Sequence, residues 1–230
     1  MLSLKNTLLQ STKSSNKALG INACRTRSGG GVAHLAALLT EQKTVHTEFQ
    51  TIHVWCDHSI VANLSLSKNV IVHEVDGGRF GLLGSLFWER FILPVQLKAL
   101  GCDLVLNVDA GTLNPYQPSV CISQDMLVFS MEEVKRHRIG LERLRLFALH
   151  KVQASALKST DAVIFLSRFA SSKIRSQVKG IDTSLIIPHG IDPEFFEISN
   201  TITEDDSALN LVYVSNTLPY KHHCNVVKGV

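Results

Sequence analysis

The sequence predicts an α/β protein built on a parallel, doubly wound sheet with helices on both faces. Short runs rich in Val and Ile alternate with longer segments of helical periodicity along nearly all of the 230 residues. Several of these runs are too apolar for a sheet that has one face in water, so a sheet covered on both faces is expected. Strand followed by helix, repeated, is typical of a parallel sheet with right-handed crossovers.

The elements follow one another in a regular order. Strands are expected at 20–24, 51–56, 70–75, 103–108, 120–123, 161–166, 184–188 and 209–214. Helices are expected at 32–41, 85–100, 141–158 and 168–178. In the third helix, one apolar stripe is typical of packing on a core; it consists of Leu141, Leu144, Phe147, Ala148, Val152 and Ala156.

A change in residue composition along the sequence predicts one nearly complete domain and the beginning of a second. After Ile187 the chain becomes turn-rich, and 199–207 is polar and acidic, so this stretch reads as a linker. We therefore expect a flexible tail at 1–17, a first domain at 18–195, a linker at 196–207, and the first β-loop-α of a second domain at 208–230. A strand at 209–214 would lack a sheet to join, so 208–230 is expected to be loosely held.

Composition excludes several classes of protein. The chain is 45% hydrophobic and 19% charged with a net charge of +3, which is ordinary for a soluble globular protein and offers no basic field for nucleic acid. No acidic residue precedes Glu41, so the leader could be a targeting peptide, although a frayed polar tail is the commoner interpretation. Five scattered cysteines predict buried free thiols in a reducing compartment, and no apolar window is long enough to span a bilayer.

A glycine triplet is the first candidate site. Gly29, Gly30 and Gly31 follow an expected strand and open an expected helix, where backbone N–H groups and the helix dipole can meet phosphate or other oxygens. The segment is not a Walker A motif, and His34 stands where a dinucleotide fingerprint has its third glycine. A tight turn without a ligand is the alternative.

Two further segments end strands, at the edge where open α/β sheets bind ligands. Gln124 and Asp125 come directly after the strand at 120–123, although Asp125 could simply cap the next segment. The segment 107–113 also follows a strand, and a plain Asp-containing turn is the more common interpretation there.

Three other features of the sequence are candidates for a function. The apolar stretch 80–100 combines Phe, Trp, Arg and Lys and could lie on a membrane surface, although packing on the sheet is the more common role for such a helix. Lys221 lies just beyond the last expected strand and could meet a phosphate in a second crevice. His222 and His223 are adjacent, point to different sides and have no evident third ligand, so no metal is expected.

Taken in order, these segments resemble the retaining glycosyltransferases of family 4, which have the GT-B fold of two Rossmann-like domains facing a cleft. The resemblance covers nearly all of 18–230. It is carried by SGGGVAHLAALL, FWERFILPVQLKALGCDLVLNVDAG, ISQDMLVF, TDAVIFLSRFASSKI, IIPHGID and VYVSNTLPYKHH. It implies a Rossmann-like parallel sheet with helices on both faces as the N-terminal, acceptor-side domain, followed by the start of a donor-side domain.

The resemblance also implies roles for residues. Gly29, Gly30 and Gly31 would approach the donor phosphates. Gln124-Asp125 stands where many members have His-Asp, so Gln124 would position a sugar hydroxyl rather than move a proton. Lys221 would neutralise the leaving diphosphate, while Asn216 occupies the usual arginine position. Neither a cofactor nor a metal is expected, only a nucleotide-sugar donor as co-substrate.

The function implied is sugar transfer with retention from a nucleotide-sugar to a glycan or lipid-linked acceptor. The expected location is the cytoplasm, free or peripheral at the inner face of the membrane. The family's Glu-x7-Glu donor motif does not occur before residue 230, so the chain by itself is expected to be an incomplete and inactive portion. A non-catalytic glycan- or partner-binding domain is the alternative, and another GT-B enzyme such as a sugar-nucleotide epimerase is a third. The broken fingerprint disfavours a nicotinamide oxidoreductase.

Overall fold

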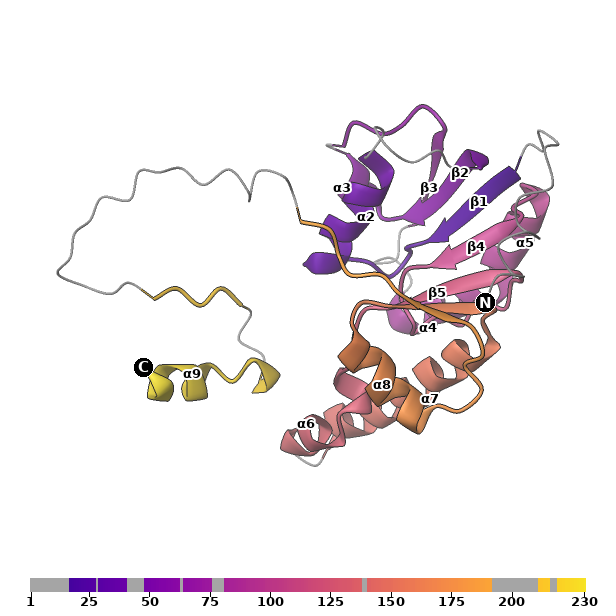
Figure 1. The fold of residues 1–230 in the computed structure, drawn as a ribbon. Helices are drawn as coiled ribbons and strands as arrows, with labels where there is room; N and C mark the ends of the chain where they lie inside the picture. Colours follow the sequence, from indigo (N-terminus) through magenta and orange to yellow (C-terminus); the bar gives the residue numbers. More distant parts are fainter. Residues whose placement is uncertain are drawn as a thin grey trace, which may run out of the picture.

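The computed structural model describes residues 17–27, 29–40, 48–62, 64–75, 81–137, 140–191, 211–215 and 219–230. Seven strands form one sheet in the order β3-β2-β1-β4-β5-β6-β7, and every neighbouring pair is parallel (Figure 1). The strands are β1 Lys17–Asn22, β2 Phe49–Cys56, β3 Val70–Glu74, β4 Leu104–Asn107, β5 Ser119–Ser123, β6 Ala162–Phe165 and β7 Ser184–Ile186. The predicted fold class and the first seven predicted strands are confirmed.

The four predicted helices are also present. The helical elements are α2 Gly30–Thr40, α3 His58–Val61, α4 Gly81–Phe87, the π-helix η1 Trp88–Ile92, α5 Leu93–Ala99, the 3-10 turn η2 Leu127–Phe129, α6 Met131–Arg136, α7 Leu141–Ser159, α8 Arg168–Gln177, the 3-10 turn η4 Pro219–Lys221 and α9 His223–Gly229. The predicted helix at 85–100 is the continuous run α4-η1-α5. Sequence periodicity missed α3 and α6, because four to six residues are too few to show it.

The sheet is wound in two directions from its centre, which places helices on both faces. From β1 the chain moves outward through β2 to β3, then returns to β4 beside β1 and moves the other way. Right-handed crossovers in opposite directions put their helices on opposite faces. Leu35 of α2 therefore packs with Ile21 and Val54 on one face, and Leu97 of α5 packs with Trp55 on the other. Helices α7 and α8 share this second face through Leu157 and Ile174, which pack with Val163 and Phe165.

The predicted apolar stripe of α7 is wrong in its first half. Leu141 is 87% exposed and Leu144 is 65% exposed. The side that packs on the core carries Leu146, Leu149, Gln153 and Leu157, together with Ala156, which the predicted stripe includes and which is buried. Both stripes satisfy helical spacing, and the buried polar Gln153 hides the true one from a pattern of hydrophobicity.

The predicted strand at 209–214 is wrong over its described part. Residues 211–215 belong to no strand, and Leu211, Val212 and Val214 are exposed. Of the strands that the structure describes, none pairs with this segment, so its apolar side chains have no face to cover. The C-terminal segment approaches α6 through His222, whose Nε2 lies 3.6 Å from Glu133 Oε1.

Other boundary predictions are tested only in part. β1 begins at Lys17, one residue inside the predicted tail. The rest of that tail and the predicted linker lie outside the described residues. All five cysteines are free thiols, and four are buried as predicted, whereas Cys224 is exposed. Burial raises the pKa of Cys102 to about 11, so this thiol stays protonated and unreactive at neutral pH.

Candidate functional site

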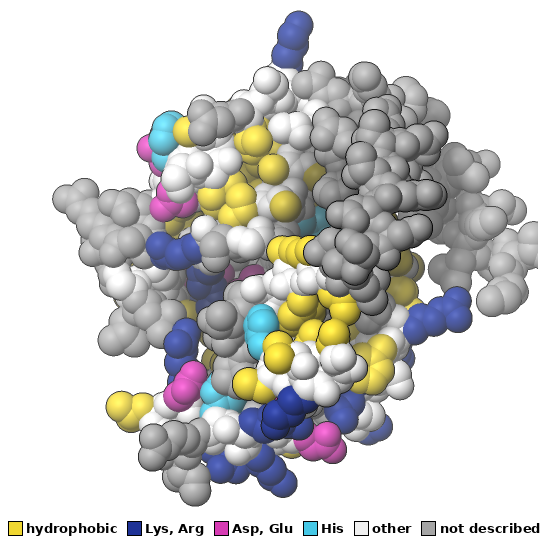
Figure 2. All heavy atoms as spheres, turned by 90° about the vertical axis from the view of Figure 1, so that its left-hand side faces the viewer, with side chains coloured by type: hydrophobic (Ala, Val, Ile, Leu, Met, Phe, Trp, Pro, Cys, Tyr) yellow, Lys and Arg dark blue, Asp and Glu magenta, His cyan; other side chains and the backbone are white. Residues whose placement is uncertain are grey.

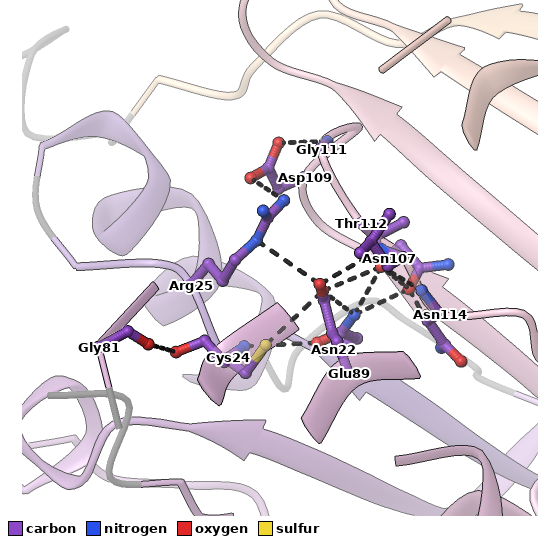
Figure 3. Close-up of polar contacts among 12 residues, drawn as sticks. Asn22, Cys24, Arg25, Gly81, Glu89, Asn107, Asp109, Gly111, Thr112 and Asn114 are labelled. Atoms are coloured by element: carbon purple, nitrogen blue, oxygen red, sulfur yellow. Dashed lines mark hydrogen bonds and ion pairs between the residues drawn. The ribbon is translucent and has the colours of Figure 1, made fainter. Parts of the chain in front are cut away.

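A buried polar cluster lies where the winding of the sheet reverses. Asn22 ends β1 and Asn107 ends β4, and the two residues pair in register. The Asn22 amide Nδ2 donates to Asn107 Oδ1 at 3.0 Å and to Glu89 Oε1 at 2.9 Å. The carboxyl ends of the strands at such a reversal are where open α/β sheets bind ligands, so the cluster marks the candidate site. Figure 3 shows its polar contacts.

Glu89 is the acceptor at the centre of this cluster. Its side chain comes from η1 and is only 1% exposed. Oε1 also accepts from Thr112 Oγ1 at 2.9 Å, and Oε2 accepts from the Leu113 amide at 3.3 Å. Hydrogen bonds from several donors compensate a buried carboxylate for the loss of water. Because these donors come from β1 and from the loop after β4, Glu89 holds that loop against the end of β1.

Arg25 lies at the rim of the same cluster. Its Nη2 donates to Asp109 Oδ2 at 3.0 Å, and its Nε lies 3.8 Å from Glu89 Oε2. Asp109 also accepts from the Gly111 amide at 2.8 Å, which is the plain Asp turn expected from the sequence. A Cβ on Gly111 would lie 2.5 Å from Arg25 Nη2, so a larger residue here would push the guanidinium away from its present position. Two carboxylates therefore hold one cation beside the glycine loop.

The structure brings two predicted site residues together. Gly29, with a φ of 68°, turns the chain into α2, a conformation that glycine adopts without strain. Gly31 lies beside Gln124, because a Cβ on Gly31 would be 3.3 Å from Gln124 Oε1. A Cβ on Gly30 would meet nothing within 4 Å, so this backbone faces open space. Figure 2 looks onto this edge of the sheet; hydrophobic side chains lie in the middle of the view, and charged and histidine side chains lie mainly to their left and below them.

A histidine pair brings the end of β7 to the same edge. His189 follows β7, and its Nδ1 lies 3.2 Å from Nδ1 of His34 in α2. The ring centroids are 4.6 Å apart in an edge-to-face arrangement. Burial, and then the charge of His189, hold the pKa of His34 below its usual value. The contact therefore favours a neutral His34 and fastens the segment after β7 to the glycine-loop helix.

The remaining predicted residues lie elsewhere. Asp125 is exposed, and its Oδ1 accepts from the Leu127 amide at 2.8 Å, so it forms an Asx turn that leads into η2. Lys221 lies in the C-terminal segment, where its ammonium stands over the Tyr220 ring and its carbonyl accepts from Tyr213 at 2.8 Å. Asn216 lies outside the described residues.

Sequence reasoning did not identify Asn22 and Glu89. Glu89 carried a usable signal, because it is the one acidic residue in the apolar stretch 80–100. A lone carboxylate in such a helix needs buried donors. Within the described ranges, no group of three His, Cys, Asp or Glu side chains could hold a metal ion. The helices in those ranges include none that is long and apolar enough to cross a membrane.

Comparison with known proteins finds a shared fold. No protein-family model matches the sequence, and no curated protein resembles it at the sequence level. Sucrose-phosphate synthase from Thermosynechococcus elongatus matches with a TM-score of 0.53 and 14% identity, over 77% of this chain and 49% of that chain. A second chain of that enzyme from the same organism matches with a TM-score of 0.46 and 12% identity, over 78% of this chain and 93% of that one.

The first of these matches, with the sheet order and the covered faces, defines the class of fold. The chain has a glycosyltransferase-like, Rossmann-like α/β fold of the GT-B type. The chain spans about half the length of the first of these two synthase chains.

Proposed function

We propose that the chain is the acceptor-side domain of a retaining glycosyltransferase of family 4, with 208–230 as the start of the donor-side domain. The parent enzyme transfers a sugar from a nucleotide-sugar to a glycan or lipid-linked acceptor. The observation that carries the proposal is the meeting of Gly31 and Gln124 at the carboxyl edge of the sheet. The glycosyltransferase-like fold supports it.

The proposed roles follow from the chemistry of each group. The amides of Gly30 and Gly31, at the start of α2, approach phosphate oxygens of the donor. Gln124 donates to or accepts from a sugar hydroxyl, because an amide can do both but cannot move a proton at neutral pH. Asp125 orders the turn that follows Gln124 through its bond to the Leu127 amide. Lys221 and Asn216 would face the leaving diphosphate.

A substitution in the glycine loop should change the affinity for the ligand without changing the stability of the fold. A Gly30→Ala side chain meets open space in the protein, so we expect the melting temperature to stay unchanged. The same methyl group would occupy the place of the phosphate. Loss of a charge-assisted hydrogen bond costs about 1.5–3 kcal/mol, so binding should weaken about tenfold to a hundredfold. Titration calorimetry with the uridine, guanosine and adenosine diphosphate sugars measures this change.

Gly140→Ala is the matched control, because a Cβ there also meets nothing within 4 Å and lies at the start of α7. It should leave affinity unchanged. Nucleotide-sugar binding that Gly30→Ala does not weaken would contradict the proposed role of the loop. If the chain binds acceptor sugars but has no affinity for any nucleotide-sugar, that result would instead indicate a non-catalytic glycan-binding domain.

A further inference from the structure

The outer side of the helical run α4-η1-α5 presents large apolar side chains to water. Phe87, Phe91 and Val95 are 59%, 55% and 66% exposed, and Ile92 and Leu100 are also exposed. We call these five residues the aromatic face. Neighbouring apolar side chains that remain exposed on a folded protein are typical of an interaction site.

The π-helix η1 aligns this face. The inner side of the run buries residues at a strict spacing of four: Ser85, Glu89, Leu93 and Leu97. Four residues exceed one α-helical turn of 3.6, and the wider π turn takes up the difference. The same adjustment lines up Phe87, Phe91 and Val95 on the outside. The ring centroids of Phe87 and Phe91 are 4.9 Å apart, so these two side chains pack on each other within the face.

The exposed charged side chains within the run itself, residues 81–100, are both positive. Arg90 and Lys98 are exposed, and the Arg90 guanidinium carbon lies 5.6 Å from the centroid of the Phe91 ring. Glu89 is the one acidic residue within 81–100, and it is buried in the polar cluster. Asp103, just beyond the run, accepts from the Ala18 amide at 2.8 Å. Apolar rings bordered by cations complement an anionic surface with an apolar interior.

We propose that the aromatic face docks on an anionic lipid surface. Phe87, Phe91 and Val95 enter the boundary between headgroups and acyl chains, and Arg90 and Lys98 meet the lipid phosphates. A second copy of the chain fits this face poorly, because a two-fold contact through it would bring the cations of both copies together without a carboxylate between them.

The docked face would lie close to the candidate site. Glu89, from the same turn as Phe87 and Phe91, bonds to Asn22 and Thr112 on the inner side. The polar cluster and the aromatic face are therefore opposite sides of one helical turn. This one step rests on the proposed function. A lipid-linked acceptor in the membrane would then lie next to the candidate site.

Vesicle sedimentation tests the docking with the whole 230-residue chain. We expect binding to vesicles of phosphatidylcholine mixed with phosphatidylglycerol, and little binding to phosphatidylcholine alone. Each cation near such a surface contributes about 1 kcal/mol, so Arg90→Gln with Lys98→Gln should weaken partitioning about 30-fold. Phe87→Ser with Phe91→Ser should abolish it, while circular dichroism and thermal melting confirm the fold.

Leu141→Ser with Leu144→Ser is the matched control, since it removes two exposed apolar side chains from α7. This control should bind as the unaltered chain does. Failure of the unaltered chain to bind, equal binding to both vesicle types, or equal loss in the control would overturn the proposal. So would a dimer, seen by light scattering, that Phe87→Ser with Phe91→Ser dissociates. No nucleotide-sugar is needed, so a failure here leaves the Gly30→Ala test unaffected.

Discussion

At the scale of single residues, the polar cluster depends on Glu89. Its carboxylate accepts from Asn22, Thr112 and the Leu113 amide, and it lies 3.8 Å from Arg25 Nε. Glu89→Ala would leave the buried Leu113 amide without this acceptor, remove one acceptor each from Asn22 and Thr112, and take a carboxylate away from Arg25, so we expect the free energy of unfolding to fall by about 3 kcal/mol. Glu89→Gln keeps the shape and one acceptor oxygen and should cost about 1 kcal/mol. Urea denaturation measures both.

Glu132→Ala provides the comparison, because Glu132 is an exposed carboxylate on α6. A substitution at such a site should change the free energy of unfolding by less than about 0.5 kcal/mol. If Glu89→Ala proves as mild as Glu132→Ala, the cluster is not what holds the loop after β4 to the end of β1.

At the scale of elements, α5 packs closely on β1 because residue 20 is a glycine. A Cβ there would overlap Leu97 Cδ2 and would lie 3.3 Å from Trp55 Cζ3. Leu97 and Trp55 are fully buried, so neither can move aside. Gly20→Ala should therefore lower the free energy of unfolding by about 2 kcal/mol, as overpacking does in other cores, and chemical denaturation measures the loss.

A double-mutant cycle identifies the cause. Leu97→Ala alone should cost about 2–5 kcal/mol. Combined with Gly20→Ala, the cost should be smaller than the sum of the two by more than about 0.5 kcal/mol, because the shortened side chain makes room for the new methyl group. Strict additivity would mean that the contact between α5 and β1 is not the source of the loss.

At the scale of the whole molecule, the sequence predicts what local patterns determine. Seven strands and four helices follow from apolar runs and periodicity, and the rule for carboxyl ends of strands places Gly31 and Gln124 at one edge. The cluster could not be predicted in this way, because Asn22 and Glu89 are separated by 67 residues and meet only in the fold. The buried side of α7 and the state of 211–214 likewise depend on neighbours that no local pattern specifies.

The segment 211–214 gives a test at this same scale, since its sequence favours a strand and its surroundings do not support one. Leu211, Val212 and Val214 are 60%, 84% and 88% exposed, and Tyr213 is bonded through its hydroxyl group to the Lys221 carbonyl. By contrast, the amides of Val105 and Val163 donate to the carbonyls of Pro118 and Thr183, directly before β5 and β7, at 3.0 and 3.1 Å.

We expect the amides of 211–214 to exchange with deuterium at least about 1,000-fold faster than those of Val105 and Val163, because buried sheet amides exchange only through rare opening. Exchange followed by mass spectrometry or NMR measures this ratio. Equal protection of both regions would show that 211–214 is paired as a strand in solution. Repeating the measurement at several protein concentrations would then separate pairing within the chain from pairing between copies, since only the second weakens on dilution.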